Sequence, residues 1–172
     1  WPQGSSRQKL APIADSGLGD HVRATALIAT LALGLALGAI VVGHLLLIPM
    51  LAGNTALVDA NLARALTEPL ALRCAEIVLA ACVLTAIVSK PGLQHRAAPT
   101  LSILAAGIAA CDRLALIPEV HQAWAKVDLV AMRPLDRIAE AEQVTMVHHA
   151  ALATMIVLLL ATAVVAHWHA SD

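Results

Sequence analysis

The chain has 172 residues, of which 59% are hydrophobic and only 13% are charged, and its formal net charge is -1 at pH 7. Soluble domains are about half apolar and about a quarter charged, so this composition excludes an ordinary water-soluble protein. It also excludes a disordered chain, and the balance of charges gives no reason to expect nucleic acid as a partner.

The first predicted elements are a polar tail and a long apolar helix. Residues 1–22 contain several Pro, Gly and Ser residues, which indicates an extramembrane tail, and residues 23–172 then form the membrane domain. Residues 24–52 carry no Asp, Glu, Lys or Arg. Because a membrane span needs about 20 apolar residues, this run predicts the first span.

The segments that follow alternate between polar and apolar. Residues 53–67 have apolar positions at helical spacing and predict a short helix in the membrane interface, with Pro69 in the first turn of the next helix. A second polar segment, 119–145, predicts an excursion from the membrane, in which Pro134 can open a helix that continues into the last span. The remaining predicted spans are 69–89, 97–117 and 146–168.

The fold class that follows is all-α, a bundle of four transmembrane helices with both termini on one side of the membrane. Basic residues divide evenly between the two sides, so the positive-inside rule does not orient the bundle. The polar excursion resembles a periplasmic loop. We therefore expect a bacterial inner-membrane protein with cytoplasmic termini.

Polar side chains of all four spans are expected in one leaflet. Antiparallel spans bring the end of one helix to the level of the start of the next, and ionisable groups inside a membrane suggest a function. The residues are His44 in span one, Arg73 and Glu76 in span two, Asp112 and Arg113 in span three, and His148 and His149 in span four.

Two interpretations of this polar layer remain open, a functional site and a structural network. In a functional site the imidazoles either relay protons with Glu76 or Asp112 or bind a metal. His44 could ligate a haem iron or another metal together with His148 or His149, of which at most one faces the bundle interior because they are adjacent. Alternatively, Arg73, Glu76, Asp112 and Arg113 form a structural network that closes the bundle. The identity of any metal is unknown at this point.

Small residues indicate close helix packing. Gly34 and Gly38 form a GxxxG pattern in the first span, which lets helices approach closely within the bundle or against a partner subunit. Cys74, Cys82 and Cys111 form no CxxC pair and suit packing positions. No phosphate-binding loop, HExxH motif or Gly-x-Ser-x-Gly motif occurs, so we expect no enzyme.

Three segments resemble a family of small bacterial four-helix membrane proteins known only as a domain of unknown function. They are residues 46–51 (LLIPML), residues 116–120 (LIPEV), and residues 140–149, where His follows an acidic helix. The resemblance covers roughly residues 24–168 and implies a four-helix bundle without implying an activity. The chain departs from the family in having no Phe or Tyr near the first Pro or before the final His.

Three functions are compatible with these features. The first is an accessory or structural subunit of a larger respiratory or photosynthetic membrane complex, with lipid, other subunits, quinone or pigment as partners. The second is an electron-transfer subunit that bears haem or a metal on His44 and His148 or His149. The third is a small ion or solute transporter.

Overall fold

The computed structural model describes residues 16–53, 60–89, 97–127 and 134–170, without the side chains of 16–23, 61, 64 and 167–170. These ranges are almost entirely helical and contain no strand. The elements are α1 (Ser16–Gly38), η1 (Ala39–Leu47), α2 (Ile48–Gly53), α3 (Ala60–Ser89), α4 (Ala97–Cys111), η2 (Asp112–Leu116), α5 (Ile117–Ala125) and α6 (Leu135–Ala170), where η marks a π-helical segment.

Four continuous helical rods confirm the predicted all-α, four-span fold. The stretches long and apolar enough to cross a membrane are Ala24–Gly53, Ala65–Ser89, Ala97–Ala125 and Leu135–Ala166. Each has 25 to 32 residues, which exceeds the roughly 20 needed to cross the hydrocarbon. These lengths and compositions indicate an integral membrane protein in a lipid environment.

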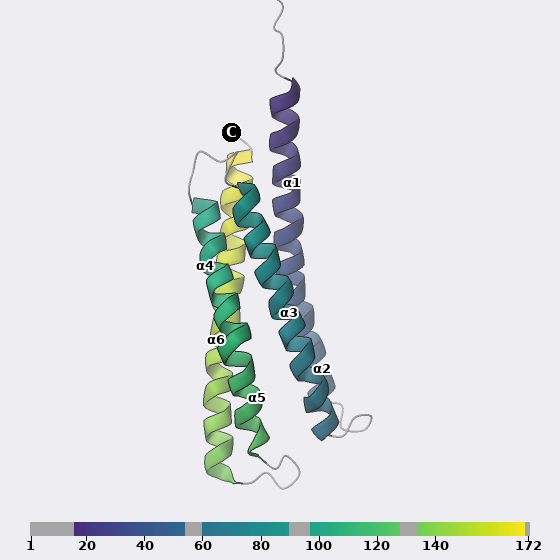
Figure 1. Ribbon diagram of the computed structural model, residues 1–172, viewed down its shortest axis with the longest axis vertical. Coiled ribbons are helices and arrows are strands. Elements are labelled where there is room, and N and C mark those ends of the chain that lie inside the picture. Colours follow the sequence, from purple (N-terminus) through teal and green to yellow (C-terminus); the bar gives the residue numbers. More distant parts are fainter. Residues whose placement is uncertain (1–15, 54–59, 90–96, 128–133, 171–172) are drawn as a thin grey trace, which may run out of the picture.

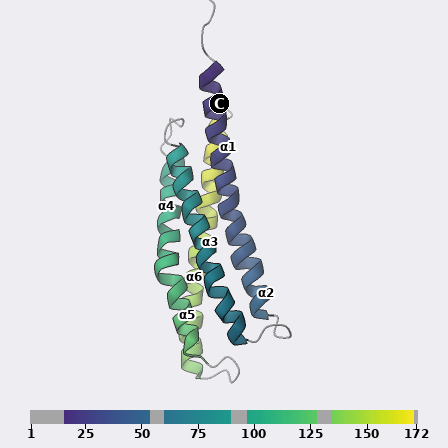
Figure 2. The same cartoon turned by 45° about the vertical axis from the view of Figure 1, so that its right-hand side comes forward.

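The rods pack in a ring. Helix α3 lies between α1 and α4, and α6 contacts both α1 and α4 from the other side (Figures 1 and 2). Helix α1 begins, and α6 ends, at one end of the bundle, whereas α2 and α5 lie at the other end (Figure 1). The main core is built of small and branched side chains, among them Ala36, Ile40, Cys82 and Leu159, all fully buried.

Each π-helical segment stands directly before an Ile-Pro pair. Proline has no N–H, and its ring collides with the carbonyl four residues earlier in an α-helix, so a wider turn relieves the strain. In η1 the Ile48 N–H donates to the Gly43 carbonyl, and in η2 the Ile117 N–H donates to the Asp112 carbonyl, both five residues back. The prolines that follow are Pro49 and Pro118.

Several boundaries differ from those expected. Helix α1 begins at Ser16, inside the expected tail, of which residues 1–15 lie outside the described part. The expected interfacial helix is not separate: its described residues, from Ala60, are the first turns of α3, and Pro69 lies inside that helix. Membrane helices tolerate such a proline because their neighbours satisfy the freed backbone groups.

The third and fourth rods are longer than the predicted spans. The third continues through Pro118 to Ala125, because Pro118 occupies the first turns of α5 and does not end the helix. The fourth begins at Leu135, directly after Pro134, whose carbonyl accepts hydrogen bonds from the N–H groups of Arg137 and Ile138. The helix that Pro134 opens therefore runs unbroken into the last span, as predicted.

The glycines of α1 do not make the close contact expected within the bundle. A Cβ atom built on Gly34 or Gly38 meets nothing within 4 Å among the described residues, so that form of the prediction is wrong. A close approach occurs at Gly43 in η1, where a Cβ would overlap the Sγ atom of Cys74 on α3. The buried thiol of Cys74 fills the space that Gly43 leaves.

Candidate functional site

His44 enters the bundle from the π-helical segment of the first rod. Its side chain is buried, with 8% exposed, and its ring centre lies 5.3 Å from that of His148 on α6, with the two ring planes tilted by 54°. The glycine beside it, Gly43, allows η1 to approach α3 closely at Cys74. The imidazoles of spans one and four therefore meet inside the protein, as expected for the polar layer.

Asp112 positions the second imidazole. The Oδ1 atom of Asp112 lies 2.6 Å from Nδ1 of His148, and the side chains are 1% and 9% exposed. A ring that donates its Nδ1–H to a carboxylate presents Nε2 as the nitrogen with a free lone pair. Among the described residues the other oxygen of the carboxylate, Oδ2, is buried and has no hydrogen-bond partner.

His149 takes a different direction from its neighbour. It is exposed, and its ring centre lies 5.8 Å from that of His148. Adjacent residues on a helix point about 100° apart, which explains why only His148 contacts both His44 and Asp112. Of the two rings, His148 packs against His44, and His149 lines the same cavity as both.

A cavity of about 520 Å³ adjoins the imidazoles at the end of the bundle that contains α2 and α5. Its apolar lining is largely alanine and branched side chains from α2, α3 and α5, including Ala52, Ala63, Ala71 and Ile117. Four alanines, Ala52, Ala60, Ala63 and Ala71, belong to this lining, and their small side chains leave room in it.

Polar groups occupy the α5 and α6 side of this cavity. His121, Trp124, Thr145 and the rings of His148 and His149 line it. The indole Nε1–H of Trp124 donates to the Thr145 hydroxyl at 3.0 Å, and that hydroxyl donates to the Ala141 carbonyl at 2.7 Å. These bonds fix α5 against α6 and hold the wall of the cavity in place.

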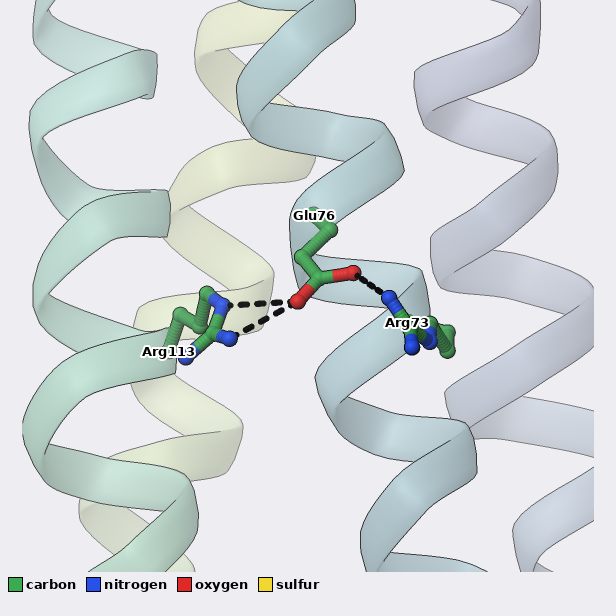
Figure 3. Close-up of polar contacts among 3 residues, drawn as sticks. All are labelled: Arg73, Glu76 and Arg113. Carbon is green, nitrogen blue, oxygen red and sulfur yellow. Dashed lines mark hydrogen bonds and ion pairs between the residues drawn. The ribbon is translucent and has the colours of Figure 1, made fainter.

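A second polar group lies on the outer side of α3. The Glu76 carboxylate accepts from both Nε (3.1 Å) and Nη2 (2.7 Å) of Arg113 on η2, and its other oxygen accepts from Nη1 of Arg73 at 2.6 Å (Figure 3). The side chains are a third exposed for Arg113 and Glu76 and 77% exposed for Arg73. This ion-pair group joins spans two and three.

The predicted layer is thus divided into two groups. Of the four residues expected to form a structural network, Arg73 and Arg113 each pair with Glu76, while Asp112 pairs with His148 instead. Asp112 and Arg113 are neighbours in the chain but point in different directions. Asp112 contacts His148 in the interior, and Arg113 contacts Glu76 on the outer side of α3. No side-chain hydrogen bond or ion pair joins the two groups in the part of the chain that the structure describes.

The sequence did not predict the close approach at Gly43 or the ion pair of Asp112 with His148. It also did not predict that His121, Trp124 and Thr145 line a cavity. The nearest available signal was the repeated Ile-Pro pair, whose proline lies five residues after His44 in one case and six residues after Asp112 in the other. No protein-family model, no curated protein and no solved structure matches this chain, so the family resemblance stays a prediction.

Proposed function

We propose that the protein is a metal-bearing membrane protein, in which His44 and His148 share one transition-metal ion beside the intramembrane cavity. The observation that carries the proposal is the row His44, His148, Asp112: two buried imidazoles in contact, one of them held by a buried carboxylate. Metal-binding histidines almost always donate their other N–H to a carboxylate or carbonyl in this way.

The distance between the rings suits a single ion. Two imidazoles that bind one tetrahedral ion at about 2.0–2.1 Å place their ring centres about 5 Å apart, close to the observed 5.3 Å. A haem bound by both rings needs the macrocycle between them, so helices α1 and α6 would have to separate. The geometry therefore supports the metal form of the hypothesis better than a haem held by both histidines.

The charge of the site supports an ion as well. A buried carboxylate with one unpartnered oxygen is costly unless positive charge lies nearby. An ion on Nε2 of His148 supplies that charge, and a monovalent ion balances Asp112. Imidazole suits copper, zinc, iron and nickel, and this charge balance favours copper(I) among them.

The protein supplies only two ligands in this proposal. Among the described residues no three His, Cys, Asp or Glu side chains are placed to hold a metal ion together. The remaining coordination positions are left for water or for a small molecule in the cavity. Open positions are typical of metal sites that act on a ligand, in contrast to closed structural sites.

The test is metal binding by the purified protein in mild detergent. Wild type and the His44→Ala, His148→Ala and Glu76→Gln variants are loaded with copper(I) or zinc, and the bound metal is measured by elemental analysis against a competing chelator. We expect about one ion per chain in wild type and in the Glu76→Gln control, and affinity at least about tenfold lower in the two histidine variants. Failure of the wild type to bind either ion would exclude the proposal, and a Soret band in the protein as purified would favour haem.

The accessory-subunit hypothesis has one separate supporting observation. Gly34 and Gly38 leave an open strip on α1, because a Cβ atom added to either glycine would meet nothing within 4 Å in the described chain. Such a strip suits the close approach of a partner helix. Replacing both glycines with Leu would then preserve the fold but abolish co-purification of the partner, whereas unchanged co-purification would remove this support.

A further inference from the structure

The ion-pair group Arg73–Glu76–Arg113 carries an excess positive charge on an outer face of the bundle. It contains two guanidinium groups and one carboxylate, and Figure 3 shows Glu76 between the two arginines, with Arg73 on the far side from Arg113. Arg113 uses two nitrogens on Glu76, whereas Arg73 makes one contact, through Nη1. Because a guanidinium has five N–H donors, Arg73 keeps donors for another anion.

The depth of this group places it near a membrane surface. Arg73 lies 16 residues before Ser89, the end of α3, and Arg113 lies 16 residues after Ala97, the start of α4. At about 1.5 Å per residue both are about 24 Å from that end of the bundle. Since the hydrocarbon is about 30 Å thick, the group lies within reach of the headgroups of the opposite leaflet.

The surroundings of the group are apolar and accessible to lipid. Ile77 follows Glu76 and is 39% exposed, and Leu114 follows Arg113 and is 74% exposed. Ile77 lies one turn after Arg73 in the direction of Ser89, so an anion that binds Arg73 from outside would sit above a side chain that suits an acyl chain. Free phosphate could bind the arginine but has no apolar part to cover this surface. A phospholipid has both a phosphate for the arginine and acyl chains for the apolar side chain.

We propose that Arg73 binds the headgroup phosphate of an anionic phospholipid, with an acyl chain along Ile77, while Arg113 holds the Glu76 carboxylate from its other side. Guanidinium groups bind phosphate oxygens through paired, charge-assisted hydrogen bonds. Arginines near the surface of a membrane attract anionic lipids in the same way. The site is distinct from the imidazole cavity, because it lies on the outer face of α3 and η2.

The test compares two lipids on the full chain. Wild-type protein in mild detergent receives equal amounts of phosphatidylglycerol and phosphatidylcholine with the same acyl chains, and bound lipids are counted by native mass spectrometry. Wild type should retain phosphatidylglycerol preferentially. In Arg73→Gln the preference should fall about fivefold, the loss expected for one arginine near the surface. The variant keeps the two contacts between Arg113 and Glu76 that join α3 to η2.

The matched control is Arg137→Gln. Arg137 forms the same kind of pair, with Glu140 three residues later at 2.7 Å, on the exposed start of α6. It should keep the wild-type preference. Equal retention of both lipids by wild type, or an equal loss in the two variants, would overturn the proposal. Displacement of the lipid by inorganic phosphate alone would show that the site recognises a soluble anion and not a lipid.

Discussion

Asp112 is the residue on which the proposed site depends most. Its carboxylate lies 2.6 Å from Nδ1 of His148 and, in the proposal, holds the tautomer of that ring and balances the charge of the ion. Neither role follows from sequence spacing, because Asp112 and Arg113 are equally polar and adjacent. Their different partners arise from the direction in which η2 presents each side chain, which a one-dimensional pattern does not contain.

The substitution Asp112→Asn should remove the charge of the side chain while leaving the fold intact. The amide can still accept from Nδ1 of His148, but it no longer carries the negative charge. We expect the affinity for copper(I) to fall about 10- to 100-fold, the usual loss for a carboxylate behind a metal-binding histidine. The measurement is chelator competition on the purified protein.

Glu76→Gln is the control for this experiment. It removes a carboxylate from the same layer, but that carboxylate contacts arginines and not imidazoles. Its affinity for the ion should match wild type. Equal affinity in the Asp112→Asn variant and in wild type would show that the carboxylate does not support a metal site.

Gly43 provides a second test at the scale of the residue. In Gly43→Ala the new methyl group overlaps the Sγ atom of Cys74, and such overpacking costs about 1–3 kcal/mol. The gain in helix propensity from glycine to alanine returns at most about 1 kcal/mol. We therefore expect a lower thermal unfolding temperature in detergent, measured by circular dichroism.

Two further variants make this prediction specific. Cys74→Ala in the Gly43→Ala background removes the overlapping sulfur and should restore most of the lost stability. Gly38→Ala should not destabilise the protein, because nothing lies within 4 Å of the added carbon in the described chain. A destabilised Gly38→Ala variant, or a Gly43→Ala variant as stable as wild type, would contradict the packing described for η1.

The π-helical segments are the elements that bring His44 and Asp112 to their positions. Each widened turn changes the rotation of the helix before it relative to the helix after it. The prolines that accompany the widened turns are visible in the sequence, but Pro69 is visible too, and α3 stays α-helical around it. The sequence therefore predicted where helices could be disturbed and not which ones adopt the wider turn.

Replacing Pro49 with Ala tests the role of η1. The variant regains a backbone N–H and loses the ring that disfavours the α-helix, so the segment should return toward α-helical geometry. A π-turn contains one residue more than an α-turn, so the return to an α-helix rotates the preceding helix by the angle of one residue, about 100°. This rotation would carry His44 away from His148. Metal affinity should fall although both histidines remain, as measured with the same chelator competition.

Pro69→Ala is the matched control for Pro49→Ala. It removes a proline from inside a span of similar length where the structure shows an ordinary α-helix. Its metal affinity should be unchanged. Comparable losses of metal affinity in both variants would indicate a general effect of proline removal. Wild-type metal affinity in Pro49→Ala would show that the π-helical geometry of η1 is not needed for metal binding.

At the scale of the molecule, the sequence predicted the bundle well. Long apolar runs predict spans because the hydrocarbon admits only segments whose backbone is satisfied internally. Antiparallel connections then place the polar side chains of all four spans in one layer, and His44 and His148 do meet there. The division of this layer into an inner and an outer group depends on helix rotation, which apolar run lengths do not determine.

The topology gives a prediction for the whole chain. With four spans, reporter fusions at positions 10, 94 and 172 should lie in one compartment, and fusions at positions 56 and 130 in the other. Compartment-specific enzymatic reporters provide the measurement. Opposite compartments for positions 10 and 172 would be incompatible with an even number of spans.

X-ray absorption spectroscopy of the copper(I)-loaded protein measures most directly whether His44 and His148 share one ion. We expect two imidazole nitrogens at about 2.0–2.1 Å in wild type and a single one in His44→Ala. We also expect no sulfur ligand, because Cys74 packs against Gly43 and does not line the cavity. A wild-type spectrum with sulfur ligands, or without imidazole scattering, would contradict the shared-ion site.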